Sequence, residues 1–101
     1  MKFNKLVRDG IPAIIGAKGQ TAVTHVATDD EYWLKLREKI KEEAAEFAED
    51  PNDEELADIL EVVHAVCDYR KISMAKLEST RKKKLEERGG FKGRLILEET
   101  K

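Results

Sequence analysis

The chain has 101 residues, 41% hydrophobic and 40% charged, with a formal net charge of −2. This length suits one domain spanning 1–101, with one modest core, and excludes two. No stretch approaches the ~20 apolar residues of a membrane span, and the single Cys67 cannot form an internal disulfide. We therefore expect a cytoplasmic protein in a reducing compartment, with no membrane partner.

Charge is distributed unevenly along the chain. Residues 29–61 contain 14 acidic and 4 basic residues, whereas 81–94 contain 7 basic and 2 acidic residues. An acidic centre with a basic arm suits a metal ion and a polyphosphate better than it suits bulk nucleic acid. The basic run also lacks interleaved aromatic residues, so we expect no nucleic-acid partner.

The first elements in chain order are short. Residues 11–15 predict one or two helical turns, with Pro12 near the first position and Gly16 or Gly19 as the stop. The β-branched residues at 21–26 allow a short edge strand, although their alternation is weak.

Two long helices follow. Thr28 begins a capping-box pattern, which predicts a helix from near Asp29 to near Glu49. Its expected buried face has helical spacing and consists of Tyr32, Trp33, Leu36, Ile40, Ala44 and Phe47. Pro51 can open the next helix, with Asp50 or Asn52 as the cap, and that helix continues to about Arg70. Residues 56–67 are apolar on nearly every face, which indicates a central helix that also packs against another subunit.

The last helix is expected from about Met74 to Arg88, between a Ser73 cap and a stop at Gly89 and Gly90. The tail is either a mobile segment or a short edge strand at 94–98. The predicted fold class is therefore all-α: an oligomeric helical bundle of about three main helices, a short N-terminal helix and, at most, short edge strands.

The two long helices carry paired carboxylates, Glu43-x-x-Glu46 and Glu55-x-x-Asp58. Residues three apart lie on one helix face, so an antiparallel hairpin can direct both pairs into the space between its helices. A solvated face is the usual explanation of Glu-x-x-Glu. Here, however, Asp58 and Glu61 interrupt an otherwise apolar helix, where charges are seldom buried without a partner. This context favours a site for a hard divalent cation, above all Mg²⁺.

Four segments together resemble a known family. They are Asn4-Lys-Leu-Val-Arg-Asp-Gly-Ile-Pro12, Lys39-Ile-Lys-Glu-Glu-Ala-Ala-Glu46, Glu55-Leu-Ala-Asp58 and Arg88-Gly-Gly-Phe91. Their order resembles small MazG-like proteins, described as phosphoribosyl-ATP pyrophosphohydrolase-like, of the all-α NTP pyrophosphatase superfamily. The likeness covers nearly the whole chain. It departs in the eight residues between Glu46 and Glu55, a short spacing, and in Gly10, where a basic residue is expected.

The resemblance implies an oligomeric helical bundle, a dimer or a tetramer, with Mg²⁺ in its active site and Mn²⁺ as a substitute. It implies cleavage of a nucleoside triphosphate between the α and β phosphates, giving a monophosphate and pyrophosphate, a reaction that can clear unwanted nucleotides. The metal ligands that it implies are Glu43, Glu46, Glu55 and Asp58.

The chemistry of phosphoanhydride hydrolysis assigns roles to further residues. A carboxylate that is not fully used in ligation can accept the proton of the attacking water. We assign Glu46 to that role beside Glu43 as the catalytic carboxylates, with Glu42 and Glu61 as the other candidates. Basic side chains neutralise the charge on the departing pyrophosphate. The available donors are Lys5, Arg8, Lys83, Lys84 and Arg88.

Two alternatives remain open. Glu61-x-x-His64 is the element that di-iron carboxylate bundles use, and a dimer can supply two copies of it. In the other, the helices form a non-enzymatic oligomerisation module whose basic run, Arg81 to Lys84, binds acidic partners or nucleic acid. Loss of turnover when Glu55 or Asp58 is replaced separates an enzyme from such a module.

Overall fold

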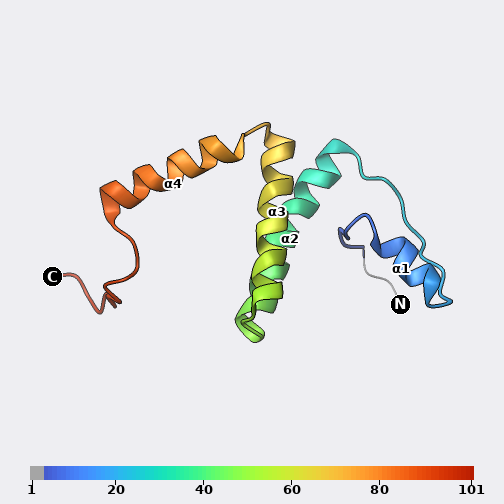
Figure 1. The fold of residues 1–101 in the computed structure, drawn as a ribbon, viewed down its shortest axis with the longest axis horizontal. Helices are drawn as coiled ribbons and strands as arrows, with labels where there is room; N and C mark the ends of the chain where they lie inside the picture. The colour runs from blue at the N-terminus through green and yellow to red at the C-terminus, as the bar shows by residue number, and fades with distance from the viewer. Residues whose placement is uncertain (1–3) are drawn as a thin grey trace.

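A computed structural model describes residues 4–101 and contains four helices in that part of the chain: α1 (Ile11–Ala17), α2 (Asp29–Glu49), α3 (Asp53–Arg70) and α4 (Met74–Arg88). The predicted all-α class is therefore confirmed. No helix within residues 4–101 combines the length and the apolar character that a membrane crossing requires. Figure 1 shows α2 and α3 at the centre, with α1 and α4 on opposite sides of them.

Helix α1 follows the N-terminal segment and has Pro12 in its first turn, as the sequence predicts. Gly16 lies inside this helix and does not stop it. The chain leaves α1 at Lys18, and Gly19 then takes a positive φ of 82°. Gly19 is therefore the glycine that marks the turn, since a positive φ carries no steric cost for this residue.

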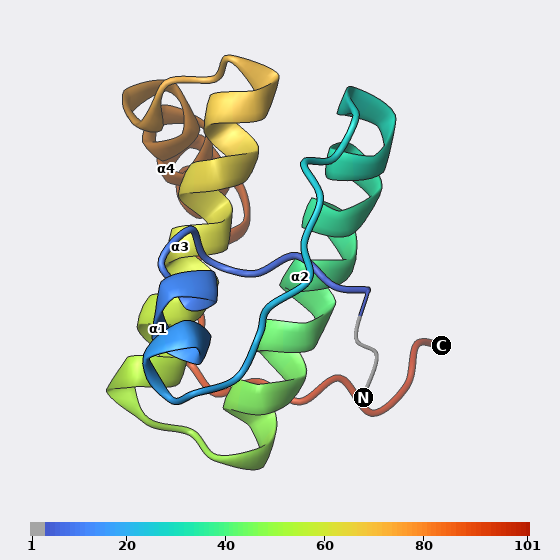
Figure 2. The ribbon, with the colours of Figure 1, turned by 90° about the vertical axis from the view of Figure 1, so that its right-hand side faces the viewer.

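Helices α2 and α3 form an antiparallel hairpin, whose two arms lie side by side and join at one end (Figure 2). The Thr28 hydroxyl caps α2 by accepting from the Glu31 amide at 3.3 Å, and the Asn52 side chain caps α3 by accepting from the Glu55 amide at 2.9 Å. Asn52 is thus the cap of α3, and Asp50 is not. Pro51 lies before this cap and does not open the helix, because a cap at Asn52 places the first turn at Asp53.

The hydrophobic core lies in this hairpin and is small. Its buried hydrophobic residues, within the described part of the chain, are Leu36, Val62 and Cys67. Four of the six residues on the predicted buried face of α2 are only half-buried, and Ala44 is exposed. The inward positions of α2 follow the spacing 36, 40, 43 and 47, so that Glu43 and not Ala44 faces α3.

Helix α4 begins at the predicted Ser73 cap, whose hydroxyl accepts from the Lys76 amide at 3.1 Å, and ends at Gly89. It projects from the hairpin (Figure 1), and α2 with α3 makes the only extensive helix–helix contact among residues 4–101. Within one chain the expected three-helix bundle is therefore a two-helix hairpin with separate flanking helices. The molecule measures 57 × 31 × 26 Å, with a radius of gyration of 17.7 Å, where about 13 Å is usual for a compact domain of this length.

The short edge strands that the sequence allows do not form. Residues 21–26 and 94–98 have no regular secondary structure, and residues 4–101 contain no strand at all. A strand needs a partner to satisfy its backbone groups, and neither segment has another extended segment paired with it. The β-branched residues at 21–26 belong instead to the connection between α1 and α2.

Candidate functional site

Two glutamates occupy inward positions near the turn of the hairpin. Glu43 lies on the same inward face of α2 as Leu36, and Glu55 lies on the same inward face of α3 as Val62. Only 6% of the surface of Glu43 is exposed, and Glu55 is half-buried. Helical spacing therefore places carboxylates where the pattern of each helix otherwise places core side chains.

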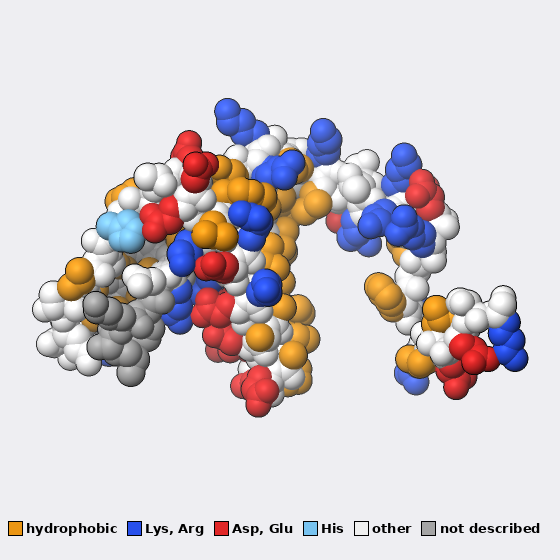
Figure 3. Space-filling model, turned by 180° about the vertical axis from the view of Figure 1, so that it is seen from behind, with side chains coloured by type: hydrophobic (Ala, Val, Ile, Leu, Met, Phe, Trp, Pro, Cys, Tyr) orange, Lys and Arg blue, Asp and Glu red, His pale blue; other side chains and the backbone are white. Residues whose placement is uncertain are grey.

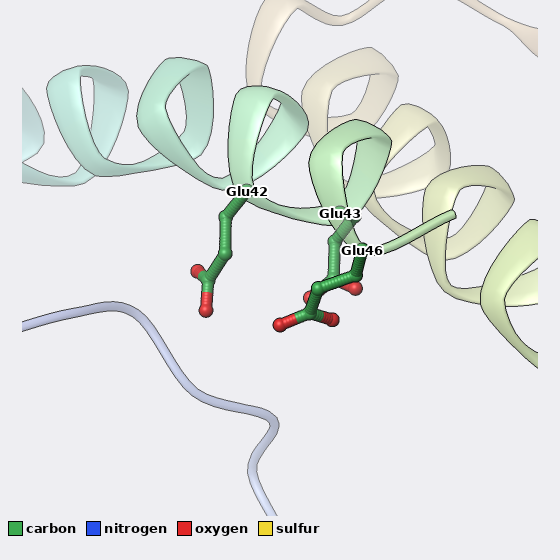
Figure 4. A group of neighbouring side chains, drawn as sticks. All are labelled: Glu42, Glu43 and Glu46. Atoms are coloured by element: carbon green, nitrogen blue, oxygen red, sulfur yellow. The ribbon is translucent and has the colours of Figure 1, made fainter. Parts of the chain in front are cut away.

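Five carboxylates gather around these positions, and we call them the carboxylate cluster. Oxygens of Glu42, Glu43 and Glu46 lie within 4.8 Å of one another, and so do oxygens of Glu43, Glu55 and Asp58. Figure 4 shows the first three side chains leaving α2 on the side where the N-terminal segment passes. Glu43 belongs to both groups and links the two helices.

All four predicted metal ligands therefore lie in the carboxylate cluster, but not as a single group. Glu46 groups with Glu42 and Glu43, whereas Glu55 and Asp58 group with Glu43 alone. Glu42 is an additional candidate ligand, which was predicted from the sequence only as a candidate base. Its position four residues before Glu46, on the same helix face, is the signal that could have identified it.

Two oxygens of the cluster are buried without a hydrogen-bond partner among the described residues, Oε2 of Glu43 and Oε2 of Glu55. A buried carboxylate oxygen without a partner is costly, since it has lost water and gained nothing in exchange. These two oxygens are carried by residues of the group that includes Asp58. They are the strongest structural indication that this site accommodates a ligand.

Lys39 partly neutralises the cluster from within α2. Its Nζ lies 3.1 Å from Oε2 of Glu42 and 3.2 Å from Oε1 of Glu43, and its side chain is 15% exposed. Burial alone would lower the pKa of Lys39, but its hydrogen bonds to the two glutamates raise it above the usual value. Lys39 therefore stays charged, a role that was not predicted from the sequence.

The pKa values of the neighbouring residues Glu42 and Glu43 are shifted in opposite directions. Burial alone would raise the pKa of Glu42, but hydrogen bonds from Lys5 and Lys39 lower it below the usual value. Burial raises the pKa of Glu43, and the adjacent Glu46 raises it further against the opposing ion pair with Lys39. The lowered pKa of Glu42 shows that its charged form is stabilised, whereas the raised pKa of Glu43 shows that charge on this residue is disfavoured.

The N-terminal segment supplies two more cations to the cluster. Lys5 Nζ donates to Oε1 of Glu42 at 3.1 Å, and Arg8 Nη2 donates to Oδ1 of Asp58 at 2.6 Å. These contacts join the segment to both helices of the hairpin, over 37 and 50 positions of sequence. The structure thus brings Arg8 of the predicted substrate site to Asp58, a predicted metal ligand, and Lys5 to Glu42, another member of the carboxylate cluster.

The three C-terminal basic residues of the predicted substrate site are not brought there. Lys83, Lys84 and Arg88 are exposed on α4, which projects away from the hairpin (Figure 1). In Figure 3 blue side chains gather over this arm, and red side chains over the hairpin. Within one chain these residues therefore do not contact the carboxylate cluster, because α4 does not fold back on it.

Glu61 and His64 lie outside the carboxylate cluster. Both are exposed on α3, and neither joins a group of three candidate metal ligands among residues 4–101. A single chain thus supplies only one isolated Glu-x-x-His pair. Glu61, the other candidate base, also lies outside the cluster.

The carboxylate cluster carries more negative than positive charge. Five carboxylates contact or adjoin three cationic side chains, those of Lys5, Arg8 and Lys39, which leaves a formal excess of two negative charges. All the candidate ligand atoms are carboxylate oxygens, the donors that hard divalent cations prefer. The residues present therefore fit Mg²⁺ or Mn²⁺ in donor type and in charge.

Comparison with known proteins identifies one similar segment. A Mycolicibacterium smegmatis protein, described as uncharacterized, is 51% identical over 43 residues, which make up 43% of this chain and 44% of that protein. The chain thus matches less than half of the length of this relative. No family model matches the chain, and no solved structure matches it significantly. The MazG-like resemblance remains a prediction from the motifs.

Proposed function

We propose that this protein is a Mg²⁺-dependent nucleoside triphosphate pyrophosphohydrolase that produces a nucleoside monophosphate and pyrophosphate. The observation that supports it most is the pair of buried, unpartnered oxygens on Glu43 and Glu55, inside a cluster of five carboxylates. Such a cluster needs a cation for charge balance, and a cation in turn attracts a polyphosphate. The motif resemblance points to the same activity.

The carboxylates would hold the cation from both helices. Glu43, Glu55 and Asp58 would bind it between α2 and α3, and Glu46 with Glu42 would extend the site along α2. When bound, Mg²⁺ would supply Lewis-acid polarisation of phosphoryl oxygens and lower the pKa of a water molecule. Mn²⁺ has similar ligand preferences and would substitute for it.

Glu46 is our candidate for the general base. It is exposed at the edge of the cluster, whereas Glu43 beside it is buried, so Glu46 can reach solvent and receive a proton. The water oxygen forms a bond to the α phosphorus, its proton passes to Glu46, and the bond between the α phosphorus and the bridging oxygen breaks. The electron pair of that bond leaves with pyrophosphate.

Lys5 and Arg8 are placed to bind the phosphates. Both come from the N-terminal segment, both are about half exposed, and both already lie beside carboxylates of the cluster. Positive charge there would stabilise the negative charge that develops on the leaving pyrophosphate. The same contribution from Lys83, Lys84 and Arg88 would require α4 of another subunit to reach the site.

The protein would act as a homo-oligomer, a dimer or a tetramer, in the cytoplasm. One chain leaves Leu56 and Leu60 of α3 each 53% exposed, on the helix that carries most of its core. A helix with apolar residues on nearly every face requires cover on more than one side. The single, buried and free Cys67 is compatible with a reducing compartment.

Pyrophosphate release tests the proposal. The assay uses standard and modified nucleoside triphosphates and phosphoribosyl-ATP, with Mg²⁺ or Mn²⁺ and an EDTA control. We expect metal-dependent release with the matching monophosphate as product. Glu55→Ala and Asp58→Ala should each reduce turnover by about a hundredfold or more, since the loss of even an outer-shell partner of a metal costs ten- to a hundredfold.

The matched control is Glu54→Ala, which removes an exposed carboxylate from the same turn of α3. It should turn over substrate at the wild-type rate, and circular dichroism should show all three variants to be helical. Turnover that is insensitive to both Glu55→Ala and Asp58→Ala would refute the site. Absence of metal-dependent release across the panel would favour the di-iron or binding-module alternatives, which iron-loading spectroscopy separates.

A further inference from the structure

The N-terminal segment, residues 4–10, is held against the hairpin through the groups that the proposed metal site requires. We call this segment the basic strap. It has no regular helix or strand before its final turn, and its two cationic side chains bind Glu42 and Asp58. The side chains of Lys5 and Arg8 are 45% and 56% exposed, so each can turn into solvent. Half-buried Leu6 and Val7 lie between them.

The contact of Arg8 is the one that a metal ion disturbs most. Its guanidinium lies 2.6 Å from Oδ1 of Asp58, and Asp58 groups with Glu43 and Glu55 within 4.8 Å. Mg²⁺ holds its ligands at about 2.1 Å, so opposite ligands of one ion lie about 4.2 Å apart. The three carboxylates therefore need only a small contraction to bind one ion. A guanidinium so close to that ion would be repelled by its charge.

Lys5 is in a comparable position at the other part of the cluster. It shares Glu42 with Lys39, one cation on each carboxylate oxygen. Lys39 is fixed in α2 and largely buried, whereas Lys5 lies on the strap and is nearly half exposed. If a cation binds beside Glu42, Lys5 is the partner that can leave without disturbing a helix.

We propose that a divalent cation and the basic strap compete for the carboxylate cluster, and that cation binding frees Arg8, and with it Lys5, to bind a phosphate. This inference rests on the proposed function. It makes the strap a partial substitute for the metal: the strap offsets two of the negative charges of the metal-free cluster and becomes part of the anion site once a cation is bound. The cation then binds first and the polyphosphate second. The two are coupled through the strap as well as through direct contact between the cation and the phosphates. By thermodynamic linkage, a bound polyphosphate also tightens cation binding.

Calorimetric titration with Mn²⁺ alone, on the full chain, tests the competition. Arg8→Gln removes the competing charge and keeps a polar, although shorter, side chain. Lys18→Gln is the matched control, because it removes one exposed positive charge after α1, in a residue with no described contact to the cluster. We expect Arg8→Gln to bind Mn²⁺ about tenfold more tightly than Lys18→Gln, within the five- to 150-fold range of coupling between sites.

The possible results separate the two proposals. Equal affinity of Arg8→Gln and Lys18→Gln would overturn the competition and leave the metal site intact. Weaker binding by Arg8→Gln would also overturn it, because Arg8 would then be a partner that positions Asp58 for the metal. Failure of the wild type and every variant to bind Mn²⁺ would refute the metal site, and the proposed function with it.

A second measurement follows Arg8 in the wild type. In a ¹H–¹⁵N spectrum, the Nε–Hε signal of Arg8 is assigned by its absence from Arg8→Gln. Addition of Mg²⁺ should move this signal toward the position of a solvent-exposed arginine, and inorganic pyrophosphate added afterwards should move it again. A signal that does not respond to saturating Mg²⁺ would contradict release of the strap.

Discussion

Trp33 of α2 and Tyr69 of α3 stack face to face, with ring centroids 5.3 Å apart and planes within 6° of parallel. They lie at the open end of the hairpin, whereas the carboxylate cluster lies nearer the turn. Arg37 and Arg70 lie over the Trp33 ring at 5.2 and 5.6 Å from its centroid. Because the buried core is small, this aromatic group is a major link between the two helices.

Replacement of Tyr69 should therefore destabilise the hairpin. We expect Tyr69→Ala to lower the free energy of unfolding by about 2 kcal/mol, less than for a fully buried aromatic residue because Tyr69 is only half-buried. Urea denaturation followed by the fluorescence of the single Trp33 measures this loss. Tyr69→Phe keeps the stack and removes only the long hydroxyl contact to the Asp29 carbonyl, 3.4 Å, and should stay within about 0.5 kcal/mol of wild type.

The pKa shifts of Glu42 and Glu43 predict opposite pH dependence of stability in the absence of metal. Glu43 has a raised pKa, so its contribution to stability is full below the usual value of 4.5 and is lost as the pH rises through the folded-state pKa. Glu42 has a lowered pKa, so its contribution is present above 4.5 and is lost as the pH falls through the folded-state pKa.

Two matched variants test this opposite pH dependence of the free energy of unfolding, with EDTA present to remove metal ions. At pH 7, Glu43→Gln should have a higher free energy of unfolding than wild type, and the gain should shrink at pH 4. Glu42→Gln should be less stable than wild type at pH 7, and the loss should shrink toward pH 3.5. Urea denaturation at each pH measures both. A change of the same sign for the two variants at pH 7 would contradict the assignment.

The exposed leucines of α3 predict where copies of the chain associate. Leu56→Ser combined with Leu60→Ser should raise the dissociation constant of the proposed oligomer by about a hundredfold or more, since a buried leucine contributes about 1.5–3 kcal/mol. Light scattering after gel filtration over a concentration series measures it. The control combines Val23→Ser and Val26→Ser, at positions 94% and 97% exposed between α1 and α2. Equal association of both variants would exclude this face.

Lys71 ends α3 in the left-handed conformation, with φ 57° and ψ 39°. A residue with a Cβ atom is strained there by roughly 1–2 kcal/mol, and glycine is the usual choice. Lys71→Gly should therefore raise the free energy of unfolding by about 1 kcal/mol, measured by urea denaturation. Lys71→Ala serves as the control, because it loses the same charge but keeps the Cβ, and should show no such gain.

Local signals in the sequence determined the helices. Thr28 and Ser73 cap helices at the predicted positions, and Gly89 ends α4, because these interactions join residues only a few positions apart. The carboxylate pairs of α2 and α3 were also predictable, since spacing along two helices with a short turn brings them together. The possible edge strands at 21–26 and 94–98 did not form, because a strand depends on a partner elsewhere in the chain, which local spacing does not reveal.

Tertiary structure alone decided which charges far apart in the sequence meet. The ion pairs of Lys5 with Glu42 and of Arg8 with Asp58 span 37 and 50 positions, and no local pattern contains such pairings. The burial of Glu43, with one oxygen unpartnered, likewise depends on how the two helices rotate against each other. The sequence by itself determined four helices and an acidic centre, because local propensity and spacing act within a few turns. That the strap, and not α4, lies beside this acidic centre follows only from how the chain packs.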